Sequence, residues 1–455
     1  MTDRPDSPES PKRHQYAERM FPAPQDLGIA QPDRAVCNVR FSTSSNLEGE
    51  GGDGSSWYEG GGAVGERAVA EIVVYPPTGG VQTQGDPFEP VKIGILVDMD
   101  LGQLLADWLD PSILALEDAM NEGVWARSPV ALITADARGL PRENYRKVID
   151  GYRWLVEQGC VVVIGPLISD NCLTLQATAD EIGVPVIGWT GAHKFASESC
   201  FTIANGDIPT EGVMCANWLY QHGHRKVGLF WEAGSSGRDY ADFFRDEALR
   251  LGMTVTREVM LEPNPRGLKE HLAEMRDMGT EGIYYGGYGY STFHFAEAFR
   301  SLDWDPPRVM GTAFMFYSNS NAWAQGLEGW HGIDQLGEDG ANPNYEAMMQ
   351  RFEARFGRAT RNVVIALAYD TARAAMQGIA NAAIPTPRHV RDGLERIRWM
   401  PATNGGPSCY VQFGPGDHKG YKGDFLTFRE LRGGELRFDG YFRPEWPSNA
   451  ATSSQ

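Results

Sequence analysis

The chain has no long apolar stretch and no excess of basic residues. Within its 455 residues, no run reaches the roughly 18 consecutive apolar residues that a membrane-spanning helix requires. Its 60 Asp and Glu residues outnumber its 41 Lys and Arg residues, which gives a formal net charge of −19. Nucleic acids and anionic membrane surfaces are bound by clusters of Lys and Arg. We therefore expect no nucleic-acid partner and no membrane insertion.

The sequence also lacks the short motifs that mark metal sites and common enzymes. None of its six cysteines forms a CxxC pair or a zinc-ligand spacing. It contains no GxSxG, HExxH or Walker sequence, and its nine histidines are scattered. We expect a protein that is not an enzyme and that holds neither a metal nor a cofactor. The cysteines are expected to be reduced, although spacing alone leaves a disulfide between Cys172 and Cys200 open.

Residues 1 to about 88 hold few apolar side chains and many Pro, Ser, Gly, Asp and Glu residues. A segment such as NLEGEGGDGSSWYEGGGAVGE cannot bury enough apolar surface to offset the entropy cost of ordering it. The sequence predicts a mostly disordered acidic tail over residues 1–88, with Ala68–Pro77 as an isolated strand or a docking segment. It also predicts a disordered C-terminus over residues 446–455. The first residues lack the apolar core of a secretory signal, which by itself predicts a cytoplasmic protein.

From Val91 onward, apolar strands alternate with amphipathic helices. The run VKIGILVDM is continuous and apolar, as in a strand of a parallel sheet that helices cover on both faces. The alternation pauses at SESCFTIANGDIP (residues 197–209) and resumes in a second series, which ends in a hairpin with an RGG turn. This order predicts the α/β class, with two doubly wound parallel-sheet lobes. Ligands of such sheets bind beyond the carboxyl ends of the strands, so the cleft between the lobes is the expected site.

Three segments carry a resemblance to a known family. They are the opening strand VKIGILV, the stretch VVVIGPLISDNCLTLQATADEIGVPVIGWTGA, and the stretch EGIYYGGYGYSTFHFAEAFRSLDWDPPRVMGT. In their order and spacing the chain resembles the type I periplasmic solute-binding proteins of branched-chain amino acid ABC transporters. The amide sensor of bacterial amidase operons is a cytoplasmic relative. The resemblance covers about residues 91–442.

The resemblance implies a two-lobe clamp whose lobes are joined by three crossing hinge segments. It places the crossings near Asn205, Gly332 and Met400. The first lobe would comprise residues 91–204 and about 333–400, and the second lobe residues 205–332 and about 401–445. Domain closure about such hinges is a known type of motion.

The resemblance also implies a function, which leaves two roles open. In the first, the protein binds a small organic solute in the interlobe cleft, without catalysis, and delivers it to an ABC permease. In the second, it is a cytoplasmic ligand-sensing regulator that acts on a protein partner, like the amide sensor. The family would place it in the periplasm or outside the cell, whereas the missing secretory signal favours the cytoplasm.

Candidate ligand contacts in the first lobe follow two of its strands. Ser169, Asp170 and Asn171 are typical residues for the start of a helix, where they either cap the helix or help its free N–H groups hold a ligand carboxylate or carbonyl. The family's carboxylate-holding serine matches Ser169. Thr190 matches a ligand-contacting position, and Ala192 falls where the family often has threonine.

Candidate contacts in the second lobe include the tyrosine-rich stretch GIYYGGYGYSTF (residues 282–293). Its glycines allow close approach of the backbone, and Tyr288 matches the family tyrosine that lines the cleft. The alternative is that these tyrosines only pack the lobe. Ser236 falls where the family often has an aromatic residue that stacks on the ligand.

One departure from the family bears on the ligand. Ala313 stands where amino-acid binders carry the acid that pairs with the ligand ammonium, and a buried ammonium without a counter-charge is costly. We therefore expect a ligand other than a simple α-amino acid. An amide, a carboxylate or a larger hydrophobic solute would fit better, because Trp108 and the aromatic residues Phe314, Phe316 and Tyr317 favour an apolar or aromatic ligand. Trp189 either walls the pocket or packs the lobe. The expectation fails if an acid from elsewhere reaches the cleft, and the candidates are Asp98, Asp100 and Asp239.

Overall fold

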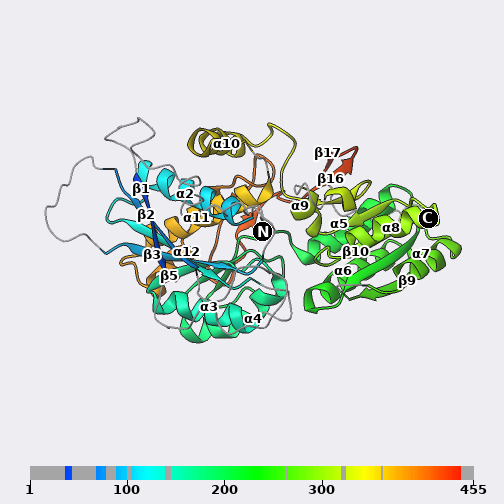
Figure 1. Cartoon of the computed structure of the whole chain (residues 1–455), viewed down its shortest axis with the longest axis horizontal. Helices are drawn as coiled ribbons and strands as arrows, with labels where there is room; N and C mark the ends of the chain where they lie inside the picture. Colours follow the sequence, from blue (N-terminus) through cyan, green and yellow to red (C-terminus); the bar gives the residue numbers. More distant parts are fainter. Residues whose placement is uncertain are drawn as a thin grey trace, which may run out of the picture.

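The computed structural model describes residues 36–43, 68–77, 89–99, 104–138, 145–262, 265–318, 324–359 and 362–441. Its strands form two seven-stranded sheets and a small sheet of three strands. Helices cover both faces of each large sheet, and the two layered units lie side by side as two lobes (Figure 1). The predicted fold of two doubly wound α/β lobes is confirmed.

The sheet of the first lobe has the order β1-β2-β4-β3-β5-β6-β7. The strands from β3 to β7 run parallel to one another. All five residues of β5 are buried, as expected for an apolar strand that is covered on both faces. The strands are β1 (Val36–Thr43), β2 (Ala68–Tyr75), β3 (Val91–Val97), β4 (Val130–Asp136), β5 (Cys160–Ile164), β6 (Val186–Gly188) and β7 (Cys200–Thr202).

Two pairs of helices cover this sheet. On one face, α2 (Leu104–Asn121) and α11 (Val363–Asn381) contribute to one apolar core, and α3 (Tyr145–Glu157) and α4 (Ser169–Ile182) contribute to the core on the other face. Two further helices, α10 (Pro343–Phe356) and α12 (Pro387–Leu394), pack against α2 and α11 respectively.

Two strands of the expected tail belong to the first lobe. β2 pairs antiparallel with both β1 and β4, and Ile72, Val73 and Val74 are buried. The strand expected within Ala68–Pro77 is therefore present, and it is not isolated. β1 was not expected, because its short apolar–polar alternation becomes a strand only by pairing with β2. Residues 1–35, 44–67 and 78–88, like residues 446–455, lie outside the described residues.

The sheet of the second lobe has the order β17-β16-β12-β11-β10-β8-β9. β8 to β12 run parallel, and the hairpin β16–β17 adds two antiparallel strands, with the expected RGG turn between them. The strands are β8 (Lys226–Glu232), β9 (Thr254–Leu261), β10 (Gly282–Gly286), β11 (Arg308–Met310), β12 (His331–Asp334), β16 (Thr427–Arg432) and β17 (Glu435–Gly440).

Helices again occupy both faces of the second sheet. α5 (Ile208–Gln221) and α6 (Ser235–Arg250) share one apolar core, and α7 (Leu268–Asp277) and α8 (Thr292–Leu302) share the other. The short helix α9 (Ala313–Ser318) follows β11. α9 lies between the two lobes in Figure 1, and its side chains join the apolar cores of both.

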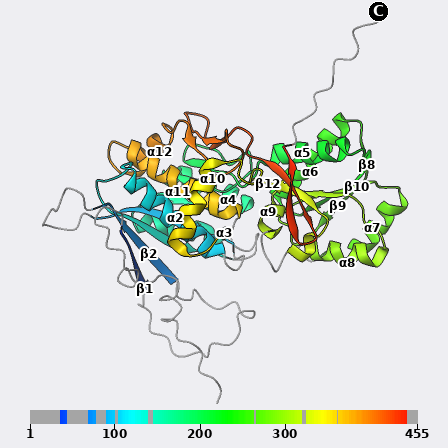
Figure 2. The ribbon, with the colours of Figure 1, turned by 90° about the horizontal axis from the view of Figure 1, so that it is seen from above.

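The third crossing differs from the prediction near Met400. β13 (Met400–Pro401), β14 (Tyr410–Val411) and β15 (Tyr421–Lys422) form the small sheet, and their buried side chains join the core of the first lobe. Phe413 packs edge-on against Phe201 of β7, and the Gly420 N–H donates to the Thr202 carbonyl at 2.7 Å. These contacts keep the chain with the first lobe after Met400, so we propose that the third crossing lies at residues 423–426. Figure 2 shows the hairpin β16–β17 on the second lobe, beyond this crossing.

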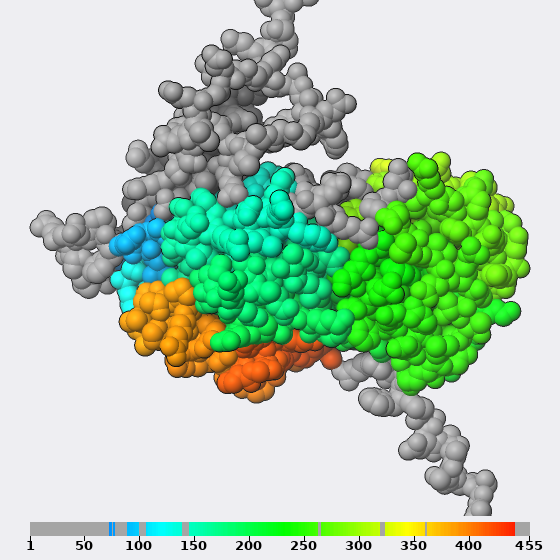
Figure 3. Space-filling view, turned by 90° about the horizontal axis from the view of Figure 1, so that it is seen from below, coloured from blue at the N-terminus to red at the C-terminus, as the bar shows by residue number. Residues whose placement is uncertain are grey.

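The two lobes adjoin on the face that Figure 3 shows, without an open gap between them. Among the described residues, no helix combines the length and apolar character needed to cross a bilayer. Five cysteines have described side chains, and all five are buried free thiols, so the disulfide left open between Cys172 and Cys200 is not formed.

Candidate functional site

A small cavity lies in the cleft, where the carboxyl ends of strands from both lobes face each other. Its volume is about 40 Å³. Among the described residues that line it, none has a charged side chain, and six carry hydroxyl groups in addition to one amide side chain. The lining residues are Met99, Leu167, Ile168, Ser169, Asn205, Ser236, Tyr240, Gly287, Tyr288, Thr312, Ala313, Phe316 and Tyr317.

The N-terminus of α4 points toward the cleft, and Asp98 occupies it. Asp98 follows β3, is fully buried, and accepts the N–H groups of Leu167 and Ile168 at 2.8 and 3.0 Å. The Asn171 side-chain amide donates to it at 2.8 Å, which gives this predicted contact residue a structural partner. Burial raises the pKa of Asp98 to about 6, against the lowering effect of these hydrogen bonds.

The N-terminus of α6 faces the same cleft from the other lobe, and Asp170 reaches it from α4. One carboxylate oxygen of Asp170 accepts the Ser236 N–H at 3.0 Å and the Ser236 hydroxyl at 2.7 Å. Asp170 is only 5% exposed, and Ser236 only 1%. These two predicted contact residues therefore meet each other across the lobe boundary.

Ser169, Thr190 and Ala192 form a short hydrogen-bonded chain in the first lobe. The Thr190 hydroxyl donates to the Ser169 hydroxyl at 2.9 Å and accepts the Ala192 N–H at 3.0 Å. Ser169 lines the cavity, whereas Thr190 and Ala192 lie behind it. The resemblance grouped these three residues, and the structure brings them together.

Glu232 fixes the tyrosine-rich turn after β10. Its buried carboxylate ends β8 and accepts the hydroxyl of Tyr285 and the backbone N–H groups of Tyr288 and Tyr290. Burial raises the pKa of Glu232 to about 6. This turn sets Tyr288 against the cavity, where burial and the negative charge of Asp170 raise the pKa of its hydroxyl well above the usual range.

A second buried acid, Glu211, supports the far wall of the cavity. Its two oxygens accept the N–H groups of Asp207, at 2.9 Å, and Thr312, at 2.6 Å. Burial raises the pKa of Glu211 to about 7. Thr312 lines the cavity together with Tyr240, so Glu211 holds the loop after β11 in position.

Ala313 lines the cavity at the start of α9, beside Phe316 and Tyr317. No acid takes its place among the described lining residues. Asp239, one of the expected substitutes, pairs with Lys194 at 3.1 Å near the surface. Asp98 is used at the start of α4, and Asp100 lies outside the described residues.

Trp108 and Trp189 do not line the cavity. Both indoles are fully buried and stack on each other with ring centroids 4.2 Å apart. The Trp189 indole N–H donates to the Thr371 hydroxyl of α11 at 2.9 Å. The structure thus places this pair in the core of the first lobe.

Several cavity residues were missed from the sequence. Tyr240 and Thr312 line the cavity, and the acids Glu211 and Glu232 support it from behind. Glu232 could have been suspected, because it is an acid that directly ends an apolar strand. Glu211 lies within a helix and contacts a loop 101 residues later, so no local pattern reveals it.

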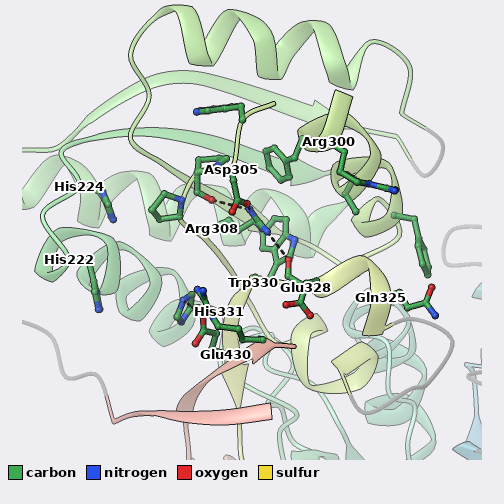
Figure 4. A pocket seen from close by; sticks show the side chains of 18 of the residues that line it. His222, His224, Arg300, Asp305, Arg308, Gln325, Glu328, Trp330, His331 and Glu430 are labelled. Atoms are coloured by element: carbon green, nitrogen blue, oxygen red, sulfur yellow. Dashed lines mark hydrogen bonds and ion pairs between the residues drawn. The ribbon is translucent and has the colours of Figure 1, made fainter. Parts of the chain in front are cut away.

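A larger hollow of about 1200 Å³ opens elsewhere on the second lobe. It lies at the amino ends of β11 and β12, opposite the edge where ligands of doubly wound sheets bind. Figure 4 shows two charged pairs on its wall: Arg308 pairs with Asp305 and donates to the Glu328 carbonyl, and His331 faces Glu430. We interpret it as a surface groove.

No group of three or more His, Cys, Asp or Glu side chains is placed to hold a metal ion in the described part of the chain. The residues that line the cavity offer hydrogen bonds from uncharged groups and apolar contact.

Residues 90–426 match the family model described as periplasmic binding protein. The fold is also that of the leucine binding protein LivK from Thermotoga maritima, which is 16% identical, with a TM-score of 0.66 over 78% of this chain and 99% of that chain. The branched-chain amino acid transporter substrate binding protein LivJ from Streptococcus pneumoniae, in complex with isoleucine, is 17% identical, with a TM-score of 0.65 over 77% and 98% of the two chains.

A solute binding protein of an ABC transporter from R. palustris, in complex with benzoate, is 15% identical, with a TM-score of 0.62 over 80% of this chain and 99% of that chain. At such identities these structures show a common fold. Among curated proteins, none matches this sequence.

Proposed function

The chain belongs to the family of type I periplasmic solute-binding proteins, and from this premise we propose that it is the substrate-binding component of a branched-chain-amino-acid-type ABC transporter. In this role it binds a small organic solute between its lobes, does no chemistry on it, and delivers it to a membrane permease. The observation that carries the proposal is the small cavity between the carboxyl ends of the two sheets.

The ligand that we propose is an uncharged solute rather than a simple α-amino acid. An ammonium group buried in the cleft would need a free acid nearby. The acids around the cavity already accept hydrogen bonds from the protein: Asp98 from α4, Asp170 from α6, and Glu211 and Glu232 from backbone N–H groups. A short amide, which offers one carbonyl and one NH₂ group, matches the hydroxyl groups and apolar side chains of the lining.

We propose Ser169, Ser236, Tyr288 and Ala313 as direct ligand contacts, because all four line the cavity. Asp170 and Thr190 would act through them, since Asp170 accepts from Ser236 and Thr190 donates to Ser169. Ala192 would support Thr190, to which its N–H donates, and Asn171 would support Asp98. Trp108 and Trp189 would contribute by packing the lobe.

The proposal is tested by a thermal-shift screen followed by calorimetry on the full chain. The panel contains leucine, isoleucine, acetamide, propionamide, benzamide and benzoate. A solute at about a thousand times its Kd stabilises the native state by roughly 4 kcal/mol, which gives a clear shift. We expect shifts with amides and none with the two amino acids.

Variants then locate the site. Ser169→Ala and Tyr288→Phe should each weaken binding of the best solute by about tenfold, as expected for loss of one hydrogen bond in an enclosed site. Tyr220→Phe, a change on the far side of α5, serves as the matched control and should bind normally. A shift with leucine or isoleucine that survives in both cleft variants would contradict the proposed ligand and site.

A binding component and a ligand-sensing regulator share this binding step, so the partner separates them. Co-purification with an ABC permease supports the transport role, and a periplasmic or extracellular location would agree with it. Co-purification with a soluble regulatory protein instead would support the sensor role.

A further inference from the structure

We propose that Asp170 determines which solutes the cleft accepts, by placing the chain's own carboxylate at the N-terminus of α6, where a ligand's acidic group would otherwise bind. This inference rests on the proposed function and concerns the selectivity of the same site. It also implies that the clamp closes on itself when no solute is bound.

Residues of both lobes form the contact that Asp170 makes across the cleft. Asp170 stands in the first turn of α4 and crosses the cleft to accept the N–H and hydroxyl of Ser236 at 3.0 and 2.7 Å. Gly234 precedes α6 and leaves room for the second carboxylate oxygen. A Cβ atom at Gly234 would lie only 2.7 Å from that oxygen.

The position favours an anion. α6 runs for 16 residues, and the first N–H groups of a helix and its dipole attract negative charge. Hydrogen bonds to a carboxylate are stronger than those between neutral groups, and both partners here are buried. The side chain of Asp170 therefore satisfies a site that would otherwise attract an anionic ligand.

In the first lobe, Asp98 accepts the N–H groups of Leu167 and Ile168, the two residues before α4. A second aspartate of the chain itself therefore lies beside the start of a helix that faces the cavity. A solute carboxylate in this cavity would have to compete with Asp170 for Ser236 and would be repelled by it. An uncharged solute meets neither obstacle.

The contact between Asp170 and Ser236 also favours the closed arrangement of the two lobes. In binding proteins of this shape, a ligand shifts the population toward the closed state only through contacts that it gains in that state. Here one contact between the lobes is supplied by the protein, and a second, exposed one joins Lys194 to Asp239. The ligand-free protein is therefore expected to populate the closed clamp.

The test compares propionate with propionamide, two probes of nearly equal shape, by calorimetry on the full chain. Wild type should bind propionate only weakly, at the upper end of the concentration range that calorimetry can follow. Asp170→Ala should gain at least tenfold in propionate affinity, and its propionate-to-propionamide ratio should rise by a similar factor. Asp170→Asn keeps the volume of the side chain and an oxygen that faces Ser236. Its gain in propionate affinity should therefore be smaller than that of Asp170→Ala.

Asp239→Asn is the matched control, because it removes an acid from the other, exposed contact between the lobes. Its propionate affinity should equal that of wild type. Hydrogen exchange of the peptide 234–240, measured without any solute, provides a second readout that does not depend on ligand choice. Exchange should be slow in wild type and Asp239→Asn, and at least tenfold faster in Asp170→Ala.

Two results would overturn the inference. One is propionate binding by wild type as tight as that by Asp170→Ala. The other is fast exchange of residues 234–240 in solute-free wild type, equal to that of the variant. Either result leaves the proposed function intact if amides still bind, whereas an absence of any solute binding alongside slow exchange would contradict the function and leave the Asp170 contact standing.

Discussion

The carboxylate of Glu211 accepts the backbone N–H of Thr312 at 2.6 Å, across 101 residues of sequence. Glu211 lies in the first turn of α5, directly after the segment that leads from β7 of the first sheet to the second lobe, and its other oxygen accepts the N–H of Asp207 in that segment. One buried acid therefore joins this segment to the loop that carries Thr312 and Ala313 to the cavity.

This acid should make stability depend on pH. Burial raises its pKa from 4.5 to about 7, so the folded state binds a proton that the unfolded state has already lost between these values. Its contribution to stability is complete below pH 4.5 and is lost as the pH rises through 7. Relative to Glu211→Gln, wild type should lose on the order of 3 kcal/mol of unfolding free energy over that range.

Urea unfolding at several pH values measures this difference. Glu270→Gln, an exposed acid in α7, is the control and should follow the wild-type curve. Parallel curves for wild type and Glu211→Gln would show that Glu211 does not take up a proton in the folded state.

Gly206 is required because of the same acid. Its φ is +102°, and a Cβ atom there would lie 2.0 Å from the Thr312 hydroxyl oxygen and 2.1 Å from a carboxylate oxygen of Glu211. Gly206→Ala should therefore destabilise the fold by more than about 3 kcal/mol, measured by urea unfolding. Gly223→Ala is the matched control. Gly223 has a φ of +90°, and no atom lies within 4 Å of a Cβ atom added there. Gly223→Ala should therefore cost only about 1–2 kcal/mol, the cost of placing alanine in a left-handed backbone conformation.

Glu232 positions the tyrosine-rich turn. Glu232→Ala leaves three buried donors unpaired, namely the hydroxyl of Tyr285 and the N–H groups of Tyr288 and Tyr290. We expect a loss of about 3–5 kcal/mol in unfolding free energy, together with weaker solute binding, because Tyr288 loses its support. Glu258 on the neighbouring strand pairs with Arg245 and accepts the Trp231 indole N–H at 3.0 Å, so Glu258→Ala should cost less, about 1–2 kcal/mol. Equal losses in the two variants would contradict this role.

Variants of the stacked pair Trp108–Trp189 can distinguish a role in packing from a role in ligand contact. Trp189→Phe should lose the hydrogen bond to Thr371 and about 1–2 kcal/mol of stability, yet keep wild-type affinity for the solute, because Trp189 does not line the cavity. Thr371→Val should cost about 1 kcal/mol, and the double variant should show that the two losses overlap. A drop in affinity without a loss of stability would make Trp189 a pocket wall instead.

Much of the fold follows from local patterns. Runs such as VKIGILV and CVVVI predict strands that are covered on both faces, because a parallel sheet buries both faces of each strand. The glycines at which the intervening helices end mark where each helix gives way to the next strand. The tyrosine-rich stretch after β10 was placed at the cleft for the same reason, since its glycines follow the carboxyl end of a strand. Ser169, Ser236, Tyr288 and Ala313 do line the cavity.

Only the tertiary structure decided how the polar groups around the cleft are used. Sequence spacing places Asp170 and Ser236 at helix starts, but it cannot tell that they bind each other across the lobes. Likewise, residues 401–422 join the first lobe through Phe413 and Tyr421, which pack beside β7 or in the first-lobe core. Hydrogen bonds and apolar contacts between distant segments depend on how whole sheets and helices are placed. The sequence therefore determined the helices, the strands and the family. The three-dimensional packing determined which partners the acidic side chains around the cleft have.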